Sequence, residues 1–376
     1  MIFRTLKQKI LQLWSVPKAI VVLGPRQVGK TTLIHQICRE AASEGYLTLN
    51  ADDLRVRQDL SNIDLATLRN IIGKNKVVFI DEAQRVHNIG LVLKLITDEL
   101  AEIKLLVSGS SALELANEIN EPLTGRKREF IMFPISWQEY ADYIGSYEAS
   151  RQLETRLIFG MYPEVITSGG DEITVLQELA GSYLYKDILN FQGIRKPEIL
   201  DKLLKALALQ VGAEVSYNEL SNLLNIDRGT IENYLGILEK AFIIFRLSPF
   251  SGNLRNEINQ SRKIYFFDNG MRNAIIGDFR LLNNRLDVGA LWENFIISEL
   301  RKKRSYAGWY GRSYFWRTYQ GQEIDYVEEI DRAFNLYEIK YSPKKQIKLP
   351  KTFGRNYPVK ESILLNAANF TQVLLT

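Results

Sequence analysis

The segment Gly24-Pro-Arg-Gln-Val-Gly-Lys-Thr31 decides the fold expected for the first part of the chain. It follows the apolar run Ala19-Ile-Val-Val-Leu23 and fits the pattern G-x-x-x-x-G-K-[S/T], and a helical pattern begins after it. A strand, a glycine-rich loop and a helix in this order form a phosphate-binding loop, because the loop N–H groups and the helix N-terminus attract an anion. We expect this loop to bind ATP through Gly24, Pro25, Arg26, Gln27, Val28, Gly29, Lys30, Thr31 and Thr32.

Two acidic residues, Asp81 and Glu82, end a second apolar run at residues 77–80. Ligands bind at the carboxyl ends of the strands in open α/β folds, so both acids are expected near the phosphate-binding loop. There Lys30 would contact the β and γ phosphates, while Thr31 and Asp81 would hold Mg2+. Glu82 would polarise the attacking water, which predicts an ATPase. The alternative is that the two acids only cap the next helix.

Serine and arginine residues further along complete the expected nucleotide site. A third apolar run ends at Ser108 and Ser110, placed like residues that sense the γ-phosphate or the water; alternatively, they cap the following helix. Arg126 is the first of three consecutive cations and a candidate arginine finger, a residue donated to the nucleotide of a neighbouring subunit. Such a finger implies a homo-oligomer, and a plain basic loop is the alternative.

Changes of pattern along the chain predict four segments. In residues 1–134 apolar runs alternate with helical patterns, which predicts an α/β fold with a parallel sheet. Residues 135–210 have helical patterns, and residues 211–285 have a helix-turn-helix pattern followed by two β-rich runs, as in a winged helix. Residues 286–376 begin with a helix over 291–300 and continue as strand-like segments. The β-rich runs of the first segment are 19–23, 46–49, 77–80, 104–107 and 129–133.

The sequence resembles AAA+ ATPases of bacteria and archaea whose loop reads GPRQVGKTT and whose second motif reads FIDEAQ. The resemblance covers nearly the whole chain and rests most on these two motifs. It implies an ATP-binding core with a helical lid, a winged-helix-like segment and a C-terminal α+β domain similar to PD-(D/E)XK nucleases, which have a restriction-endonuclease-like fold. The segments that carry the resemblance are 24–32, 79–84, 108–111, 123–126, 161–164 and 183–188.

The nuclease-like comparison predicts a particular hairpin near the C-terminus. Two segments with period-two alternation flank residues 329–335, which we expect to form a turn region. A hairpin centred between residues 331 and 332 places Asp325 opposite Glu338, with both carboxylates on one face. Apolar residues such as Ile324 would then project from the other face.

Lys340 would project from the same face as the two carboxylates and lie opposite Glu323. In this arrangement Asp325 and Glu338 would hold Mg2+, and Lys340 would orient the nucleophile. The resemblance adds Glu293 as the acidic residue that these nucleases carry on their first helix. The alternative is a polar hairpin face with cross-strand ion pairs, in which Lys340 pairs with Glu323.

Positive charge is concentrated near the C-terminus. Residues 301–376 contain 14 Lys and Arg against 7 Asp and Glu, although the whole chain has a net charge of only +4. This surplus predicts DNA binding through the C-terminal region, and a solvated basic face is the alternative. The cations singled out there are Arg301, Lys302, Lys303, Arg304, Arg312, Arg317, Lys344 and Lys345.

The helix-turn-helix pattern is a weaker candidate for DNA binding. Its second helix, between residues 227 and 240, carries three acids against two cations, whereas a recognition helix needs a basic surplus. A structural or protein-contacting role is therefore favoured for it. The better DNA candidates of this segment are Arg246, Arg255, Arg262 and Lys263.

Composition excludes several classes of protein. With 376 residues, 46% hydrophobic and 24% charged, the chain is neither disordered nor collagen-like. One cysteine and two histidines are too few for a structural zinc site. No apolar run approaches the roughly 18 residues of a membrane span, so we expect a cytoplasmic protein with no membrane partner.

Two functions follow from the sequence. The first is an ATPase that binds and hydrolyses ATP with Mg2+ and is coupled to a nuclease-like module that binds nucleic acid. The second is an ATP-operated switch acting on a protein partner, in which the nuclease-like fold is a catalytically inactive scaffold. Metal-dependent cleavage of DNA separates the two.

Overall fold

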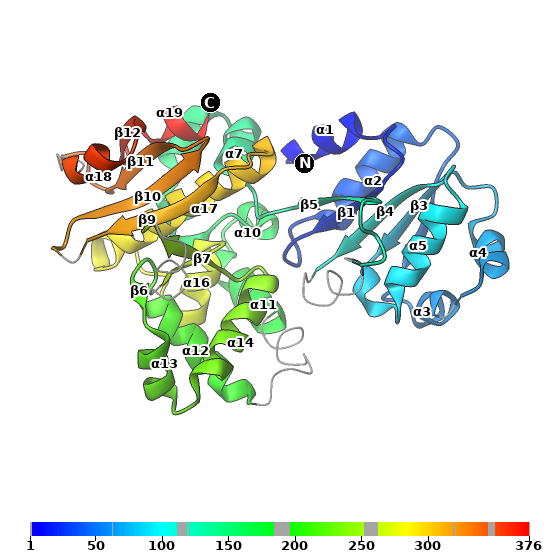
Figure 1. The fold of residues 1–376 in the computed structure, drawn as a ribbon, viewed down its shortest axis with the longest axis horizontal. Helices are drawn as coiled ribbons and strands as arrows, with labels where there is room; N and C mark the ends of the chain where they lie inside the picture. The colour runs from blue at the N-terminus through cyan, green and yellow to red at the C-terminus, as the bar shows by residue number, and fades with distance from the viewer. Residues whose placement is uncertain are drawn as a thin grey trace. The chain divides into compact units, whose positions relative to one another are not determined.

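A computed structural model of the chain describes residues 2–61, 63–110, 119, 121–183, 196–251, 262–318, 320–344 and 350–375 (Figure 1). The chain divides into two compact units, one of residues 1–135 with 240–242 and the other of residues 136–239 with 243–376. Within the described ranges, no helix combines the length and the apolarity that crossing a membrane requires.

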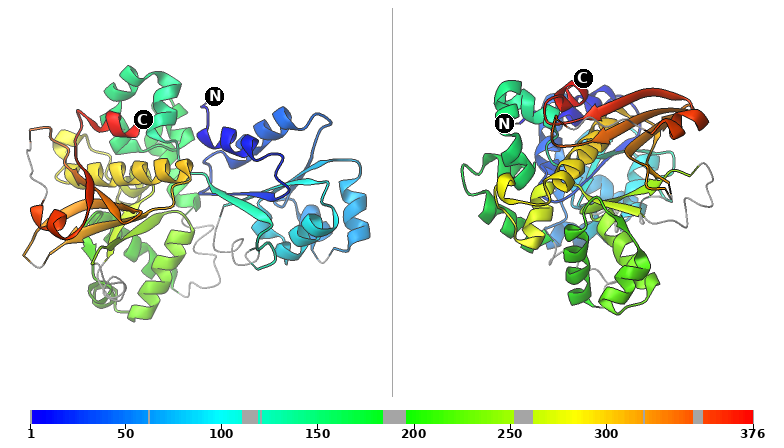
Figure 2. Two further views of the ribbon diagram at one scale, coloured as in Figure 1. Left: turned by 45° about the horizontal axis from the view of Figure 1, so that its top comes forward. Right: turned by 90° about the vertical axis from the view of Figure 1, so that its left-hand side faces the viewer.

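The first unit contains a five-stranded sheet in the order β2-β3-β4-β1-β5, and every strand pair in it is parallel. Helices α1 and α2 lie over one face of this sheet and α5 lies over the other (Figures 1 and 2). The predicted parallel α/β sheet is therefore confirmed. The elements are α1 Thr5–Gln12, β1 Ala19–Leu23, α2 Lys30–Ala41, β2 Leu47–Asn50, α3 Leu54–Leu60, α4 Leu65–Ile72, β3 Val77–Asp81, α5 Ile89–Glu99, β4 Lys104–Gly109 and β5 Lys127–Ile131.

Strand β5 begins two residues earlier than the sequence predicts, because Lys127 pairs with Ala19 at the start of β1. The chain then passes directly over Gly24, where the Met132 N–H donates to the Leu23 carbonyl at 2.7 Å. A Cβ atom on Gly24 would lie 2.1 Å from the Met132 carbonyl oxygen, and the φ of Gly24 is +153°. Only glycine fits here, so packing against the segment that follows β5 fixes this position of the loop.

The second unit contains a mixed seven-stranded sheet in the order β12-β11-β10-β9-β7-β8-β6. The long helix α17 runs along this sheet (Figure 2). Its elements are α7 Trp137–Ile144, α8 Ser146–Arg151, α9 Leu153–Phe159, α10 Pro163–Thr167, α11 Glu172–Tyr183, α12 Pro197–Leu209, β6 Glu214–Val215, α13 Tyr217–Leu224, α14 Arg228–Lys240, β7 Ile244–Pro249, β8 Arg262–Phe266, α16 Asn269–Ile276, α17 Val288–Ala307, β9 Arg312–Arg317, β10 Glu323–Ile330, β11 Ala333–Ile339, α18 Lys351–Asn356, β12 Val359–Leu365 and α19 Phe370–Leu374.

Strands from two predicted segments share this sheet. Strand β7, from residues 211–285, pairs in parallel with β9, from residues 286–376, through Ser248 and Tyr314. The Phe250 N–H extends the pairing by donating to the Phe315 carbonyl at 2.7 Å. The two segments therefore form one continuous hydrogen-bonded structure.

The hairpin of β10 and β11 has the predicted register, in which Tyr326 pairs with Tyr337 and Ile330 with Ala333. The turn is shorter than the predicted region 329–335, because the strands continue to within two residues of each other. Asp331 and Arg332 close it with φ values of 51° and 63°. Two-residue turns of this kind favour Asn-Gly or Asp-Gly, and the absence of glycine hides the turn from sequence analysis.

One detail of the predicted hairpin is wrong. Ile324 packs with Val327 and Leu336 in a buried cluster, although the alternation predicts opposite faces for residues 324 and 327. The reason is a β-bulge, because the pairing of β10 with β9 shifts by one residue between Ile324 and Val327. A bulge reverses the side-chain alternation beyond it.

Helix α16 approaches α9 so closely that a side chain at Gly270 has no space. A Cβ atom there would lie 2.1 Å from the Phe159 carbonyl oxygen. Asp268 fixes this contact, because its carboxylate caps α16 by accepting from the Met271 N–H and also accepts from the Met161 N–H at 2.6 Å.

We predict that Gly270→Ala lowers the free energy of unfolding by about 2 kcal/mol or more, because backbone atoms cannot yield to the added methyl group. The control is Gly236→Ala in helix α14, where a Cβ atom meets nothing within 4 Å and stability should rise by up to ~1 kcal/mol. Urea denaturation of both variants measures the difference. Equal stability of Gly270→Ala and the parent would contradict the packing described.

Candidate nucleotide and metal sites

The phosphate-binding loop lies between β1 and α2, with Pro25, Arg26, Gln27 and Val28 inside it and Thr32 in the first turn of α2. Gly29 precedes the helix with a φ of +93°, which turns the chain into α2. Lys30 is buried, and its Nζ donates to the Gly24 carbonyl at 2.9 Å and to the Pro25 carbonyl at 2.7 Å. The lysine therefore lies across the mouth of the loop, where its charge would meet a phosphate.

The acids lie beside this loop because β4 is the only strand between β1 and β3. Thr31 Oγ1 donates to Asp81 Oδ2 at 2.9 Å. The other oxygen of Asp81 accepts from the hydroxyl of Ser108, and the Glu82 N–H donates to Ser108 Oγ at 3.3 Å. A hydroxyl and a carboxylate in direct contact beside the loop are the oxygen donors that Mg2+ requires, so the residues present fit the expected ion.

Glu82 is held in a fixed orientation at the end of β3. Its backbone is left-handed, with a φ of 51°. Its carboxylate accepts from Gln84 Nε2 at 2.6 Å and from Ser110 Oγ at 3.1 Å. Both hydrogen bonds use the same oxygen, Oε2. Among the residues that the structure describes, none bonds to the second carboxylate oxygen, so this oxygen can accept a hydrogen bond from a water.

Arg4, whose role no sequence motif predicts, supports the loop from behind. The Arg4 side chain is buried and donates to the Val28 carbonyl and to the Phe133 carbonyl, both at 2.6 Å. It therefore ties the phosphate-binding loop to the segment that follows β5. A single arginine between Phe3 and Leu6 was the only signal in the sequence, and its partners are 24 and 129 residues away.

Arg126 lies near the amino ends of the strands, whereas the phosphate-binding loop of the same chain lies at their carboxyl ends. Its carbonyl accepts from the Ala19 N–H at the start of β1, whereas the loop follows the end of that strand. Strand β1 has five residues, so its two ends lie roughly 16 Å apart at about 3.3 Å per residue. The guanidinium is exposed and pairs with Asp98. Arg126 thus has no access to its own nucleotide site.

The predicted C-terminal cluster forms at the open end of the hairpin. Lys340 Nζ lies 2.9 Å from Asp325 and 2.8 Å from Glu338. The Ile339 N–H also donates to Asp325 at 2.7 Å, so this carboxylate is fixed against β11. Burial raises the pKa of Glu338, and the Asp325 carboxylate raises it further. Burial alone would lower the pKa of Lys340, but the two carboxylates outweigh it and raise this pKa.

A second lysine, Lys263 on β8, extends this cluster. It is buried, and its Nζ lies 3.2 Å from Glu293 and 2.7 Å from Glu323. Glu293 also accepts from the Tyr265 hydroxyl at 2.7 Å. Glu323 therefore pairs with Lys263 and not with Lys340. Burial raises the pKa of Glu293, in spite of the opposing charge of Lys263.

Lys263, predicted to lie on a DNA-contacting wing, is buried inside the second unit. Arg246 is likewise engaged, with Glu239 and the Tyr217 hydroxyl. The run 301–304 is also used within the unit: Arg301 lies over the rings of Phe245 and Phe267, Lys302 pairs with Glu299, Lys303 donates to the Val373 carbonyl and Arg304 pairs with Glu328. These cations stabilise the fold and do not form a free basic face.

Some predicted residues lie outside the described part of the chain. They are Ser111, residues 184–188, Arg255 and Lys345. Across the described part, no three or more His, Cys, Asp or Glu side chains converge into a group that could hold a metal ion. In the C-terminal cluster the two carboxylates would have to be completed by water or by a ligand. One oxygen, Glu338 Oε2, is buried with no hydrogen-bond partner among the described residues, so an acceptor is available there.

Three sequence families match successive parts of the chain. Residues 16–141 match a family described as an AAA domain. Residues 150–281 and 288–374 match two domains of unknown function, DUF8612 and DUF4143. The first unit is therefore similar to AAA domains, and the two later families carry no function to transfer.

Similar proteins match over most of the chain. An uncharacterized protein of Mycobacterium tuberculosis is 28% identical over 327 residues, which cover 85% of this chain and 70% of that protein. An uncharacterized protein of Methanocaldococcus jannaschii is 27% identical over 318 residues, which cover 78% of this chain and 69% of that protein. Among solved structures, the Walker-type ATPase of Pyrococcus abyssi is similar, with a TM-score of 0.52 and 16% identity over 73% of this chain and 96% of that one. This last likeness concerns the fold.

Proposed function

We propose that the chain binds and hydrolyses ATP with Mg2+ in its first unit. The observation that carries this proposal is the contact of Thr31 with Asp81 beside the phosphate-binding loop, 2.9 Å between Oγ1 and Oδ2. Lys30 is the cation for the β and γ phosphates, and Thr31 and Asp81 hold the metal. When bound, Mg2+ supplies charge neutralisation at the phosphates. Ser108 keeps Asp81 oriented by donating to it.

Glu82 is the proposed base. Gln84 and Ser110 both donate to one of its carboxylate oxygens and fix the orientation of the carboxylate. The other oxygen would accept a hydrogen bond from the attacking water. Ser110, predicted to sense the γ-phosphate or the water, thereby connects the end of β4 to the proposed base and orients it. For the other segments we propose the predicted roles. The helices of residues 135–210 form a lid of the ATPase, and residues 211–285 form a winged-helix-like segment.

We predict that Glu82→Gln binds ATP within about threefold of the parent and hydrolyses it roughly 10²- to 10⁴-fold more slowly, because the base is lost while the phosphate contacts remain. Phosphate release at saturating ATP and calorimetric affinity measure the two effects. The control is Glu102→Gln, an exposed acid before β4, which should change neither. Unchanged turnover of Glu82→Gln would remove Glu82 from this role.

Arg126 is the proposed finger for a neighbouring subunit, since it cannot reach its own loop. Alone, Arg126→Ala should bind ATP normally and turn over at least 10²-fold more slowly, and Lys30→Ala should not bind ATP. Mixing the two inactive variants should restore turnover, because Lys30→Ala subunits carry an intact finger for Arg126→Ala sites. Arg128→Ala, an exposed neighbour, serves as the control. Full turnover of Arg126→Ala, or no recovery on mixing, contradicts a shared site.

For the second unit we propose a nuclease-like module that acts on DNA. This proposal is supported by the convergence of Asp325, Glu338 and Lys340. A carboxylate oxygen of each acid lies within 3 Å of Lys340 Nζ. Asp325 and Glu338 would hold Mg2+ through oxygen atoms, and Lys340 would orient a water. Glu293 stands beside them as the acid of the first helix.

A specific observation favours the alternative of an ATP-operated switch with an inactive scaffold. Lys340 already bridges Asp325 and Glu338, and Lys263 already bridges Glu293 and Glu323. Two lysines thus neutralise the four carboxylates. A metal ion would have to displace a lysine from its ion pairs, and the free-energy cost of breaking these pairs opposes metal binding. In this case the cluster stabilises the fold and the partner is a protein.

Mn2+ titration and DNA nicking decide between the two. A nuclease requires Mn2+ binding that Asp325→Asn removes and Glu361→Gln, an exposed control on β12, leaves intact. Nicking should then disappear in Asp325→Asn and in Lys340→Met while ATP turnover persists. Absence of nicking on single-stranded, double-stranded and branched DNA would discard the nuclease and retain the scaffold.

A further inference from the structure

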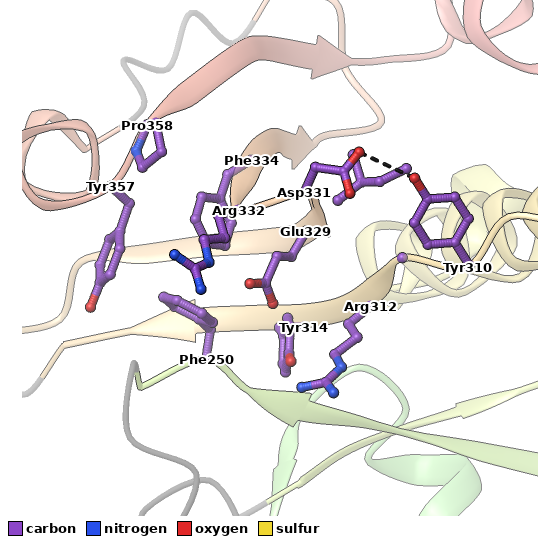
Figure 3. Close-up of a pocket in the computed structure, with 12 residues that line it drawn as sticks. Phe250, Tyr310, Arg312, Tyr314, Glu329, Asp331, Arg332, Phe334, Tyr357 and Pro358 are labelled. Carbon is purple, nitrogen blue, oxygen red and sulfur yellow. Dashed lines mark hydrogen bonds between the residues drawn. The ribbon is translucent and has the colours of Figure 1, made fainter.

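A pocket of about 970 Å3 lies at the closed end of the β10–β11 hairpin, within the second unit (Figure 3). Its apolar wall is an aromatic cluster, in which the ring of Phe250 lies 5.4 Å from Tyr314, 5.1 Å from Phe334 and 4.9 Å from Tyr357. Phe250, Tyr314 and Phe334 are buried and Tyr357 is half-buried, so Tyr357 is the most exposed ring of this wall. The carboxylate cluster described above is at the other end of the same hairpin, so the two sites are separate.

Two charged side chains of opposite sign enter this pocket from the hairpin. In the view of Figure 3 the Arg332 guanidinium lies between Tyr357 and Glu329, and the Glu329 carboxylate points toward Phe250 and Tyr314. Neither side chain has a hydrogen-bond or ion-pair partner among the residues that the structure describes. Arg312, at the start of β9, adds a second exposed guanidinium to the lining. The pocket thus offers a cationic rim, one acceptor group and an aromatic wall.

The position of Arg332 is held against the preference of its backbone. Arg332 and Asp331 both have left-handed φ values, a conformation that favours glycine. The Tyr310 hydroxyl donates to Asp331 at 3.1 Å, which braces the turn (dashed line in Figure 3). A glycine at residue 332 would relax the turn, so the arginine occupies a strained position at the mouth of a pocket.

We propose that this pocket binds a guanine nucleotide unit, with the base against the aromatic wall and the phosphate at the arginines. Aromatic rings stack on nucleobases, and guanidinium groups bind phosphate through paired hydrogen bonds. The Glu329 carboxylate accepts two hydrogen bonds from the N1–H and the 2-amino group of guanine. The unit comes either from a free nucleotide or from a single-stranded nucleic acid, and the chemistry of recognition is the same.

Glu329 decides between this ligand and other anions. A carboxylate in the pocket repels the side chains of an acidic peptide, whose backbone N–H groups do not form a rigid pair of adjacent donors as the edge of guanine does. It also discriminates among bases, because uracil has one ring N–H and no amino group. The pocket therefore combines attraction of a phosphate with selection for a base that donates twice. This proposal is independent of ATP hydrolysis and of the metal site.

The test uses the full-length chain with Lys30→Ala, so that nucleotides do not occupy the phosphate-binding loop. Calorimetry with GMP and UMP should show GMP binding at least tenfold more tightly. Glu329→Gln should abolish this preference, and Arg332→Gln should weaken both ligands about tenfold. Arg355→Gln, an exposed cation on α18 outside the pocket, should change neither.

Arg332→Gly separates binding from folding. It should raise the urea midpoint, because the turn relaxes, and lower GMP affinity about tenfold. A 5′-phosphorylated single-stranded tetranucleotide of guanosine that binds more tightly than GMP identifies nucleic acid as the source, and equal or weaker binding identifies the free nucleotide. No binding of GMP, equal binding of GMP and UMP, or affinities unchanged by Glu329→Gln and Arg332→Gln overturn the proposal.

Discussion

The second unit depends on the side-chain amide of Asn294, buried on helix α17. Its oxygen accepts from the Phe266 N–H at 2.7 Å, and its nitrogen donates to the Phe266 carbonyl at 3.1 Å. The amide acts as a short extra strand for β8, since buried backbone groups must find partners. This attachment fixes the rotation of α17 about its axis. The next residue toward the N-terminus, Glu293, is thereby directed at Lys263 and Tyr265.

Residues of the proposed nucleotide site and of the C-terminal cluster could be predicted where a sequence pattern marks their position. In the first unit Asp81, Glu82 and Ser108 lie at the carboxyl ends of β3 and β4 in one parallel sheet, so a motif and runs of apolar residues suffice to place them. The register of the β10–β11 hairpin was also predicted, because period-two alternation excludes a slip of one residue and a turn centred between residues 331 and 332 selects the observed pairing. Arg4 was not, since its partners are backbone carbonyls that no sequence pattern marks.

The errors have physical causes of two kinds. The bulge at Ile324 and the two-residue turn at Asp331 are local departures from ideal strands, and the residues there carry no glycine to reveal them. The engagement of Lys263 and of residues 301–304 is a tertiary effect, because a surplus of lysine and arginine says nothing about which cations face inward. Arg301 shows this most clearly: its guanidinium lies between aromatic rings, 4.8 Å from the centroid of Phe245. Charge counting predicts a surface only where the fold leaves the charges outside.

The pairing of β7 with β9 has a consequence for how such chains evolve. Removing residues 286–376 would leave β7 with one uncovered edge of N–H and C=O groups, which is a template for association with other chains. Neither half of the sheet is thus a self-sufficient module that recombination can move to another protein alone. Residues 211–285 and 286–376 must therefore be inherited together if both edges of β7 are to stay paired.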